Sequence, residues 1–170
     1  KLHRNVTNER MIRGIADAIK ANANIGANVI IGFPGETKDM IFETIDLVRA
    51  ARQVASDQLG EEKAIEKLSS MIHLYQPYSG TPLRKEAIDM GLIPEDFISG
   101  DYRMDSIGTG KMSGDELKGL QRTFNLYVDS PKQLWDDIKI AEKFTDEGNA
   151  KFAEYAKKYQ LKHFGRTSFS

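Results

Sequence analysis

The chain has 170 residues, a length typical of one globular domain. Its 24 Lys and Arg residues are balanced by 25 Asp and Glu residues, so the composition does not indicate a basic surface for nucleic acid or an anionic membrane. Because it contains no cysteine, it holds no disulfide and no cysteine-ligated zinc or iron–sulfur cluster. Without a long apolar run or the apolar core of a signal peptide, we expect a cytoplasmic protein with neither nucleic acid nor a membrane as partner.

The first half of the chain predicts alternating helices and strands. Apolar residues at helical spacing predict an amphipathic helix over 7–22, and a β-branched run predicts a strand over 27–33, buried on both faces, parallel and central. A second helix follows from Thr37. After a charged loop with a short helix over 56–67, residues 70–76 predict another buried strand, which a proline ends. The strand–helix–strand order favours a right-handed βαβ unit with two parallel strands.

The second half predicts helices only. A short helix is expected over 82–90, a Gly- and Asp-rich segment over 91–112, and three helices after it. Their predicted N-caps are the hydroxyl residues Ser113, Ser130 and Thr145.

Two parallel strands make an incomplete sheet. Each strand leaves one row of backbone N–H and C=O groups unpaired, and a buried strand has no polar face to show to water. Either further strands exist in sequence beyond these residues, or the strand edges pair with another copy of the chain. The pattern predicts a piece of a larger barrel or open sheet.

The most informative stretch for function is 29–37, where a strand breaks into a Gly-Phe-Pro-Gly turn before a helix. Backbone groups and a helix N-terminus at such a place favour small-molecule binding. Gly32 and Gly35 permit close approach, Ile30 is expected to share a strand face with Gly32, and Glu36 offers a hydrogen-bond acceptor to a ligand. The alternative is an ordinary strand-to-helix turn with an acidic residue in the first helical turn.

Two motifs carry a resemblance to a known superfamily. Ile-Ile-Gly-Phe-Pro-Gly-Glu-Thr at 30–37, followed by Tyr-Gln-Pro-Tyr-Ser-Gly-Thr-Pro-Leu at 75–83 and by Gly91, resembles the second half of radical S-adenosylmethionine enzymes. More narrowly, it is similar to their cobalamin-binding and anaerobic cyclase-like group. The resemblance implies an α/β fold: residues 1–92 form the βαβ portion of a partial (β/α)6 TIM-like barrel, and residues 93–170 a mainly helical C-terminal extension.

In that superfamily, a Cys-x3-Cys-x2-Cys loop near the first strand holds a [4Fe-4S] cluster that cleaves adenosylmethionine to a 5′-deoxyadenosyl radical. The resemblance places Ile30 and Gly32 at adenine-contacting positions and Asn28 where the motif often has glycine. Gly35 stands where the motif usually has its acidic residue, and the acid follows one position later. The cofactor-binding residues implied are therefore Asn28, Ile30, Gly32, Pro34, Gly35 and Glu36.

His73 and Tyr75 are the substrate-side candidates. Strand periodicity places both on the same face as Met71, so His73 either points into a barrel toward the substrate or packs against a helix. No histidine of the chain has the neighbours of a metal site, so we predict no metal ligand and no catalytic residue here.

The resemblance implies one part of an enzyme. The parent protein would use S-adenosylmethionine and a [4Fe-4S] cluster, with cobalamin as a further possible cofactor. The fragment alone would be inactive and would bind none of them tightly. Its expected partners are the missing N-terminal half of the barrel, or a second copy joined through the strand edges. The alternative is a non-catalytic helical binding or assembly module that completes its sheet by dimerising.

Overall fold

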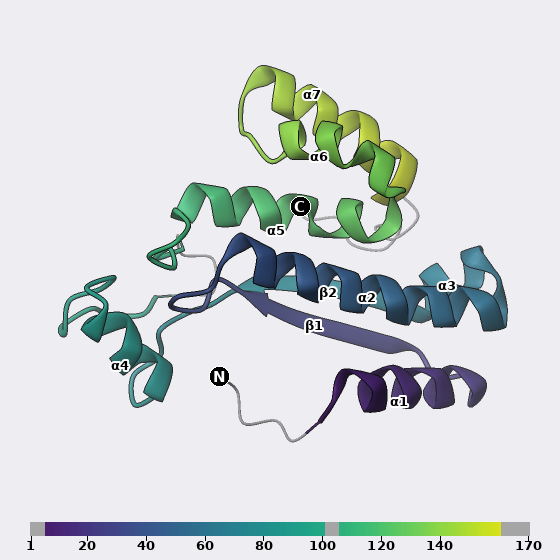
Figure 1. Cartoon of the computed structure of the whole chain (residues 1–170), viewed down its shortest axis with the longest axis horizontal. Helices are drawn as coiled ribbons and strands as arrows, with labels where there is room; N and C mark the ends of the chain where they lie inside the picture. Colours follow the sequence, from purple (N-terminus) through teal and green to yellow (C-terminus); the bar gives the residue numbers. More distant parts are fainter. Residues whose placement is uncertain (1–5, 101–105, 161–170) are drawn as a thin grey trace.

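A computed structural model describes residues 6–100 and 106–160. The first part contains a parallel strand pair with its helices: α1 (Asn8–Lys20), β1 (Ile25–Ile31), α2 (Lys38–Leu59), α3 (Glu61–Lys67), β2 (Leu68–Leu74) and α4 (Pro82–Asp89) (Figure 1). The second part is helical: α5 (Gly114–Asp129), η1 (Lys132–Leu134), α6 (Trp135–Ala141), α7 (Asp146–Tyr155) and η2 (Ala156–Gln160). The remainder of the predicted tail lies outside the described residues. Among the helices described, none has the length and apolar character needed to cross a membrane.

Hydroxyl side chains start five of the helices. The side-chain oxygen of each accepts a backbone N–H from the first turn of α1, α2, α4, α5 or α7, as an N-cap does, and these residues are Thr7, Thr37, Thr81, Ser113 and Thr145. The predicted caps Ser113 and Thr145 are confirmed. The predicted cap Ser130 is wrong, because its N–H bonds to the carbonyl of Leu126 and ends α5, and a 3₁₀ turn follows instead.

β1 and β2 form a two-stranded parallel sheet, as the βαβ pattern predicts. The register pairs Ile25 with Leu68 and Ile31 with Leu74. The prediction of a central strand buried on both faces is wrong for the part of the chain that the structure describes, because burial alternates along β1 and β2 is its one partner. The cause is that the helices cover one face of the sheet, so the other remains open to solvent.

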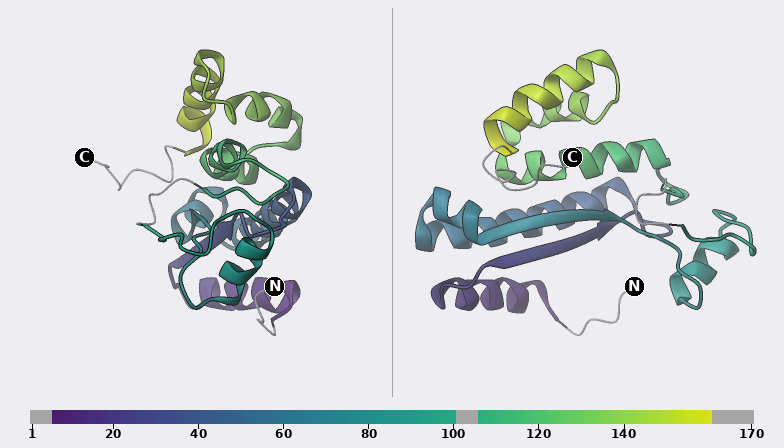
Figure 2. Two further views of the ribbon diagram at one scale, coloured as in Figure 1. Left: turned by 90° about the vertical axis from the view of Figure 1, so that its left-hand side faces the viewer. Right: turned by 180° about the vertical axis from the view of Figure 1, so that it is seen from behind.

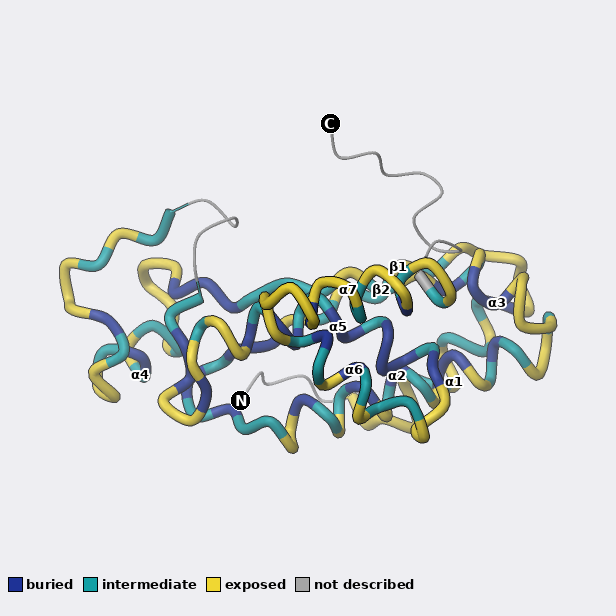
Figure 3. The backbone as a smooth tube through the Cα atoms, turned by 90° about the horizontal axis from the view of Figure 1, so that it is seen from above, coloured by how far each residue is buried: buried dark blue, intermediate teal, exposed yellow. Residues whose placement is uncertain are grey.

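The covered face packs on a layer formed by α1, α2 and α5. Buried side chains from both halves of the sequence meet there, among them Ile31, Ile41, Ile45, Leu117, Leu120 and Phe124. Figure 3 shows this burial along the middle of α2 and α5. Figure 2 (right) views the molecule from the other side, where the strands face the viewer and α2 lies behind them.

Side chains of α5 fasten the helical tail to β2. The Gln121 amide donates to the Ile72 carbonyl at 2.9 Å, and the Ser70 hydroxyl donates to the Asn125 amide oxygen at 2.6 Å. Further out, α6 and α7 stack on α5 (Figure 1). One hydrophobic core therefore joins the βαβ unit to the tail, and the loops after β1 and β2 lie at the edge of that core.

Candidate functional site

The open face of the sheet brings three of the predicted site residues together. The register places Ile30 opposite His73 and Asn28 opposite Met71. Ile30 is 43% exposed, Met71 is 58% exposed, Asn28 is also exposed and His73 is half-buried. Apolar side chains at solvent on a sheet face indicate a surface made to be covered.

The position of His73 bears on the two alternatives for this residue. The side chains of α5 reach β2 at Ser70 and Ile72, which alternate with His73 along the strand. Since successive residues of a strand point to opposite faces, His73 lies on the face opposite α5. His73 therefore does not pack against α5, the helix that covers the other face of β2.

Gly32 begins the loop that follows β1. Its φ is +91°, in the region that favours glycine, and a Cβ at this position would lie 3.2 Å from Leu117 Cδ1. The strand ends at Ile31, so the chain turns here and Gly32 is buried against α5. The expectation that Gly32 shares a strand face with Ile30 is wrong for this reason. The loop leaves the open face instead of lining it.

Glu36 closes this loop from within. Its Oε2 accepts the backbone N–H of Gly32 at 2.5 Å and of Phe33 at 3.3 Å, and the Glu36 N–H donates to the Phe33 carbonyl at 2.9 Å. Glu36 is 8% exposed, and Pro34 is also buried. The carboxylate therefore fixes the shape of the loop by accepting from its own backbone, where the sequence predicts an acceptor for a ligand.

Tyr75 packs against the loop that follows β1. Its N–H donates to the Ile31 carbonyl at 2.8 Å, which continues the strand pairing by one step, and its ring lies 5.4 Å from that of Phe33 between centroids. Tyr75 is 7% exposed, and burial raises the pKa of its hydroxyl. Tyr75 directly follows Leu74, the last residue of β2, and its N–H continues the pairing, so its grouping with His73 on one face stays a prediction.

Thr109, from the tail, is a site residue that the sequence prediction missed. The Gly35 N–H donates to the Thr109 carbonyl at 2.8 Å, and the Thr109 hydroxyl donates to the Glu36 carbonyl at 2.8 Å. Thr109 is fully buried between Gly108 and Gly110, whose φ angles are +75° and +77°. Gly-Thr-Gly signals a tight turn, but nothing local in the sequence indicates which loop the turn contacts.

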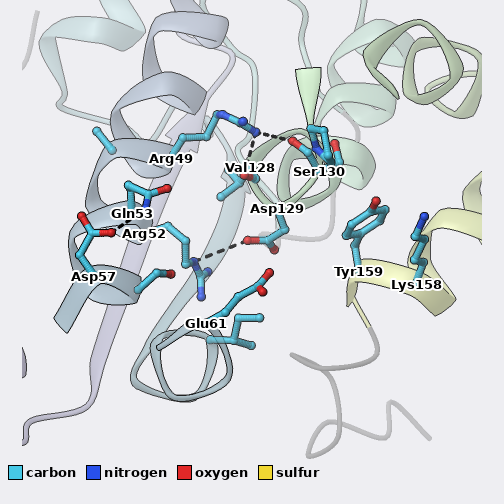
Figure 4. Close-up of a pocket in the computed structure, with 14 residues that line it drawn as sticks. Arg49, Arg52, Gln53, Asp57, Glu61, Val128, Asp129, Ser130, Lys158 and Tyr159 are labelled. Atoms are coloured by element: carbon cyan, nitrogen blue, oxygen red, sulfur yellow. Dashed lines mark hydrogen bonds and ion pairs between the residues drawn. The ribbon is translucent and has the colours of Figure 1, made fainter. Parts of the chain in front are cut away.

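A separate cleft of about 1000 Å³ lies on the helical side, between α2, α3 and the end of α5 (Figure 4). Two of its basic residues, Arg49 and Arg52, have partners within the chain. Arg52 Nε lies 3.5 Å from Asp129 Oδ1, and burial lowers the pKa of Arg52 while Asp129 opposes that change. Arg49 donates to three carbonyls at the end of α5, those of Tyr127, Val128 and Ser130. These contacts fasten α2 to α5, so we assign the cleft a structural role.

The described residues contain no group of three or more His, Cys, Asp or Glu side chains able to hold a metal ion. Because the chain also has no cysteine, its donor set does not fit an iron–sulfur cluster.

Comparison with known proteins finds similarity to curated tRNA-2-methylthio-N(6)-dimethylallyladenosine synthases. The chain is 28% identical over 134 residues to the synthase of Desulforamulus reducens, covering 69% of this chain and 27% of that protein. It is 31% identical over 126 residues to that of Thermoanaerobacter sp. strain X514, covering 62% and 26%. The chain thus spans about a quarter of the length of these relatives. No family model and no solved structure matches it.

These relatives support the resemblance to radical S-adenosylmethionine enzymes at the level of the superfamily. They give no support to the narrower cobalamin-binding group, nor to cobalamin as a cofactor.

Proposed function

We propose that this chain is the C-terminal part of a radical S-adenosylmethionine enzyme, and that its open sheet face is the inner wall of a partial (β/α)6 barrel. The observation that carries the proposal is the placement of Asn28, Ile30 and His73 on one face of two parallel strands, whereas α1, α2 and α5 pack against the other face. Parallel barrels have this arrangement, with helices outside and strand side chains inside.

The proposed ligand position is the carboxyl end of the two strands, where α/β proteins bind small molecules. There the exposed side chain of Ile30 offers an apolar surface for the flat adenine ring, and Asn28 offers an amide on the same face. Glu36 acts indirectly, because its carboxylate holds the backbone of the Gly32–Phe33 turn beside this surface. The chain's own part is thus to bind and orient the adenosyl group.

The cluster would be held elsewhere in the whole protein, since this chain has no cysteine to bind it. When bound, such a cluster supplies the electron that cleaves adenosylmethionine. We assign no step of that cleavage to the residues described above.

The names of the relatives raise tRNA as the parent's substrate. A net charge of −1 gives this chain no general attraction for a phosphate backbone. We therefore propose that contacts to RNA are supplied outside these residues, while His73 lies on the substrate side of the open face.

The test uses the complete protein that contains these residues, reconstituted anaerobically with iron and sulfide. We expect calorimetry to detect adenosylmethionine binding, and Ile30→Asp to weaken it by at least about tenfold, because a carboxylate replaces the apolar contact of the adenine. Ile98→Asp is the matched control, since Ile98 is 83% exposed in the loop after α4 and its change should leave the affinity within about twofold. Equal affinity for both variants, or an upstream sequence without three clustered cysteines, would sink the proposal.

A second candidate is an assembly module that dimerises through its sheet. The exposed Ile30 and Met71 and the unpaired strand edges favour it. The two candidates differ in the complete protein. The barrel predicts a monomer in which upstream strands pair with the β1 and β2 edges, so the protection of these edges from hydrogen exchange does not depend on protein concentration. The assembly module predicts that this protection is lost when dilution dissociates the dimer.

A further inference from the structure

We infer that Thr109 is a positioning residue for the loop over 32–36 after β1, so that the turn over 108–112 of the helical tail supports the proposed ligand surface beside that loop. This inference rests on the function proposed above. It is carried by the hydrogen bonds of one buried hydroxyl group and of the backbone around it.

The Thr109 hydroxyl uses all of its hydrogen-bonding capacity. It donates to the Glu36 carbonyl at 2.8 Å and accepts the N–H groups of Lys111 at 3.1 Å and Met112 at 3.0 Å. A hydroxyl has one donor hydrogen and two acceptor lone pairs, and all three are engaged here. The same atom therefore shapes the tail turn and attaches it to the loop after β1.

The backbone of Thr109 makes a second attachment to the same loop. Its carbonyl accepts the Gly35 N–H at 2.8 Å, and its N–H donates to the Met112 carbonyl at 3.0 Å. The loop is thus held on both sides of the Gly35–Glu36 peptide. Since the Glu36 side chain in turn holds Gly32, the position of Thr109 is transmitted to the end of β1 beside Ile30.

The tail turn is tightly packed around Thr109. A Cβ at Gly108 would lie 2.9 Å from the Met112 carbonyl oxygen, and Thr109 itself has no exposed surface. Without the hydroxyl, the Glu36 carbonyl and two amides of the turn would lose their partner in a buried place. We therefore expect the loop to shift or to become mobile when the hydroxyl is removed.

The test compares Thr109→Val, which removes the hydroxyl and keeps the shape, with Thr109→Ser, which keeps the hydroxyl. Thr123→Val is the matched control, because Thr123 is also fully buried and its hydroxyl donates only within α5, to the Gly119 carbonyl at 2.9 Å. In the complete protein, we expect Thr109→Val to raise the Kd for adenosylmethionine about tenfold, and Thr109→Ser and Thr123→Val to change it by less than about twofold.

The second readout needs no ligand. Hydrogen exchange of the Gly32, Gly35 and Glu36 amides is followed in the 170-residue chain. Faster exchange in Thr109→Val than in Thr123→Val, with recovery in Thr109→Ser, is the expected result. Equal exchange in all the variants would overturn the positioning role. If the unmodified complete protein fails to bind adenosylmethionine, the proposed function is refuted, and the exchange result still decides whether Thr109 positions the loop.

Discussion

Ile30 and His73 lie opposite each other in the parallel register of β1 and β2, on the sheet face that faces away from α5. Ile30 is 43% exposed and His73 is half-buried, and the exposed Met71 lies on the same face. We therefore expect the rest of a barrel, a ligand or a second copy of the chain to contact this surface.

The first prediction concerns self-association of the 170-residue chain. Because Ile30 and Met71 expose apolar surface on the open face, we expect the isolated chain to associate in sedimentation experiments. The double variant Ile30→Lys with Met71→Lys should shift it toward the monomer through charge repulsion. Ile98→Lys, in a loop away from the sheet, should leave the association unchanged. Association that is insensitive to the double variant would exclude this face as its cause.

The second prediction concerns Gly32. Gly32→Ala should lower the free energy of unfolding by at least about 1–2 kcal/mol, because its φ of +91° is unfavourable for a residue with a Cβ and Leu117 must also move. Gly26→Ala, on the open face with nothing within 4 Å of the added Cβ, should stay within about 0.5 kcal/mol of the unmodified chain. Urea unfolding of both variants measures the difference, and similar values would contradict the tight fit of Gly32.

The third prediction concerns the buried pair of Arg52 and Asp129, whose side chains are 9% and 7% exposed. Asp129→Asn should destabilise the chain by about 3 kcal/mol, because it leaves a buried guanidinium without its counter-charge. Arg52→Met with Asp129→Asn should be less harmful than Asp129→Asn alone, since no charge then remains unpaired. Lys85→Ala, which breaks an exposed pair with Asp89, should cost at most about 1 kcal/mol. Thermal unfolding compares the four proteins.

The fourth prediction concerns acid stability at the start of α5. The Ser113 N–H donates to the Glu116 carboxylate at 2.8 Å, and this bond, together with the Ser113 side chain, lowers the pKa of that carboxyl from the ordinary value of 4.5. A lowered folded pKa means that the ionised carboxylate stabilises the fold above pH 4.5 and that this contribution is lost as the pH falls through the folded pKa. Glu116→Gln should therefore flatten the decrease in unfolding free energy between about pH 6 and about pH 3. A slope equal to that of the unmodified chain would refute the linkage.

Local signals in the sequence were sufficient for much of the fold. The caps Ser113 and Thr145 and the parallel pairing of β1 with β2 follow from side-chain chemistry and from the order of the elements, both of which are readable along the chain. The local sequence did not predict how far the strands are buried. A β-branched run is typical of a strand covered on both sides, whereas the described residues supply helices to only one side.

In the candidate site, too, some features follow from the local sequence and others depend on tertiary packing. Strand periodicity alone predicts which residues of one strand share a face, but the register that places His73 beside Ile30 is known only from the structure. The carboxylate of Glu36 bonds backward to its own turn, and Thr109 reaches the loop from 73 positions away, so both depend on tertiary packing. The barrel itself stays a prediction that the complete protein must test.

The hydrogen bonds from Arg49 to carbonyls at the end of α5 determine whether the helical tail can be moved to another protein. The C-terminus of a helix carries a partial negative charge, because its last carbonyl oxygens have no partner within the helix. At the end of α5, the positive charge that offsets it is the guanidinium of Arg49, which belongs to α2 of the βαβ unit. Grafting the tail onto another scaffold would therefore need an equivalent arginine on the host. The βαβ unit and the tail are accordingly expected to depend on each other for stability.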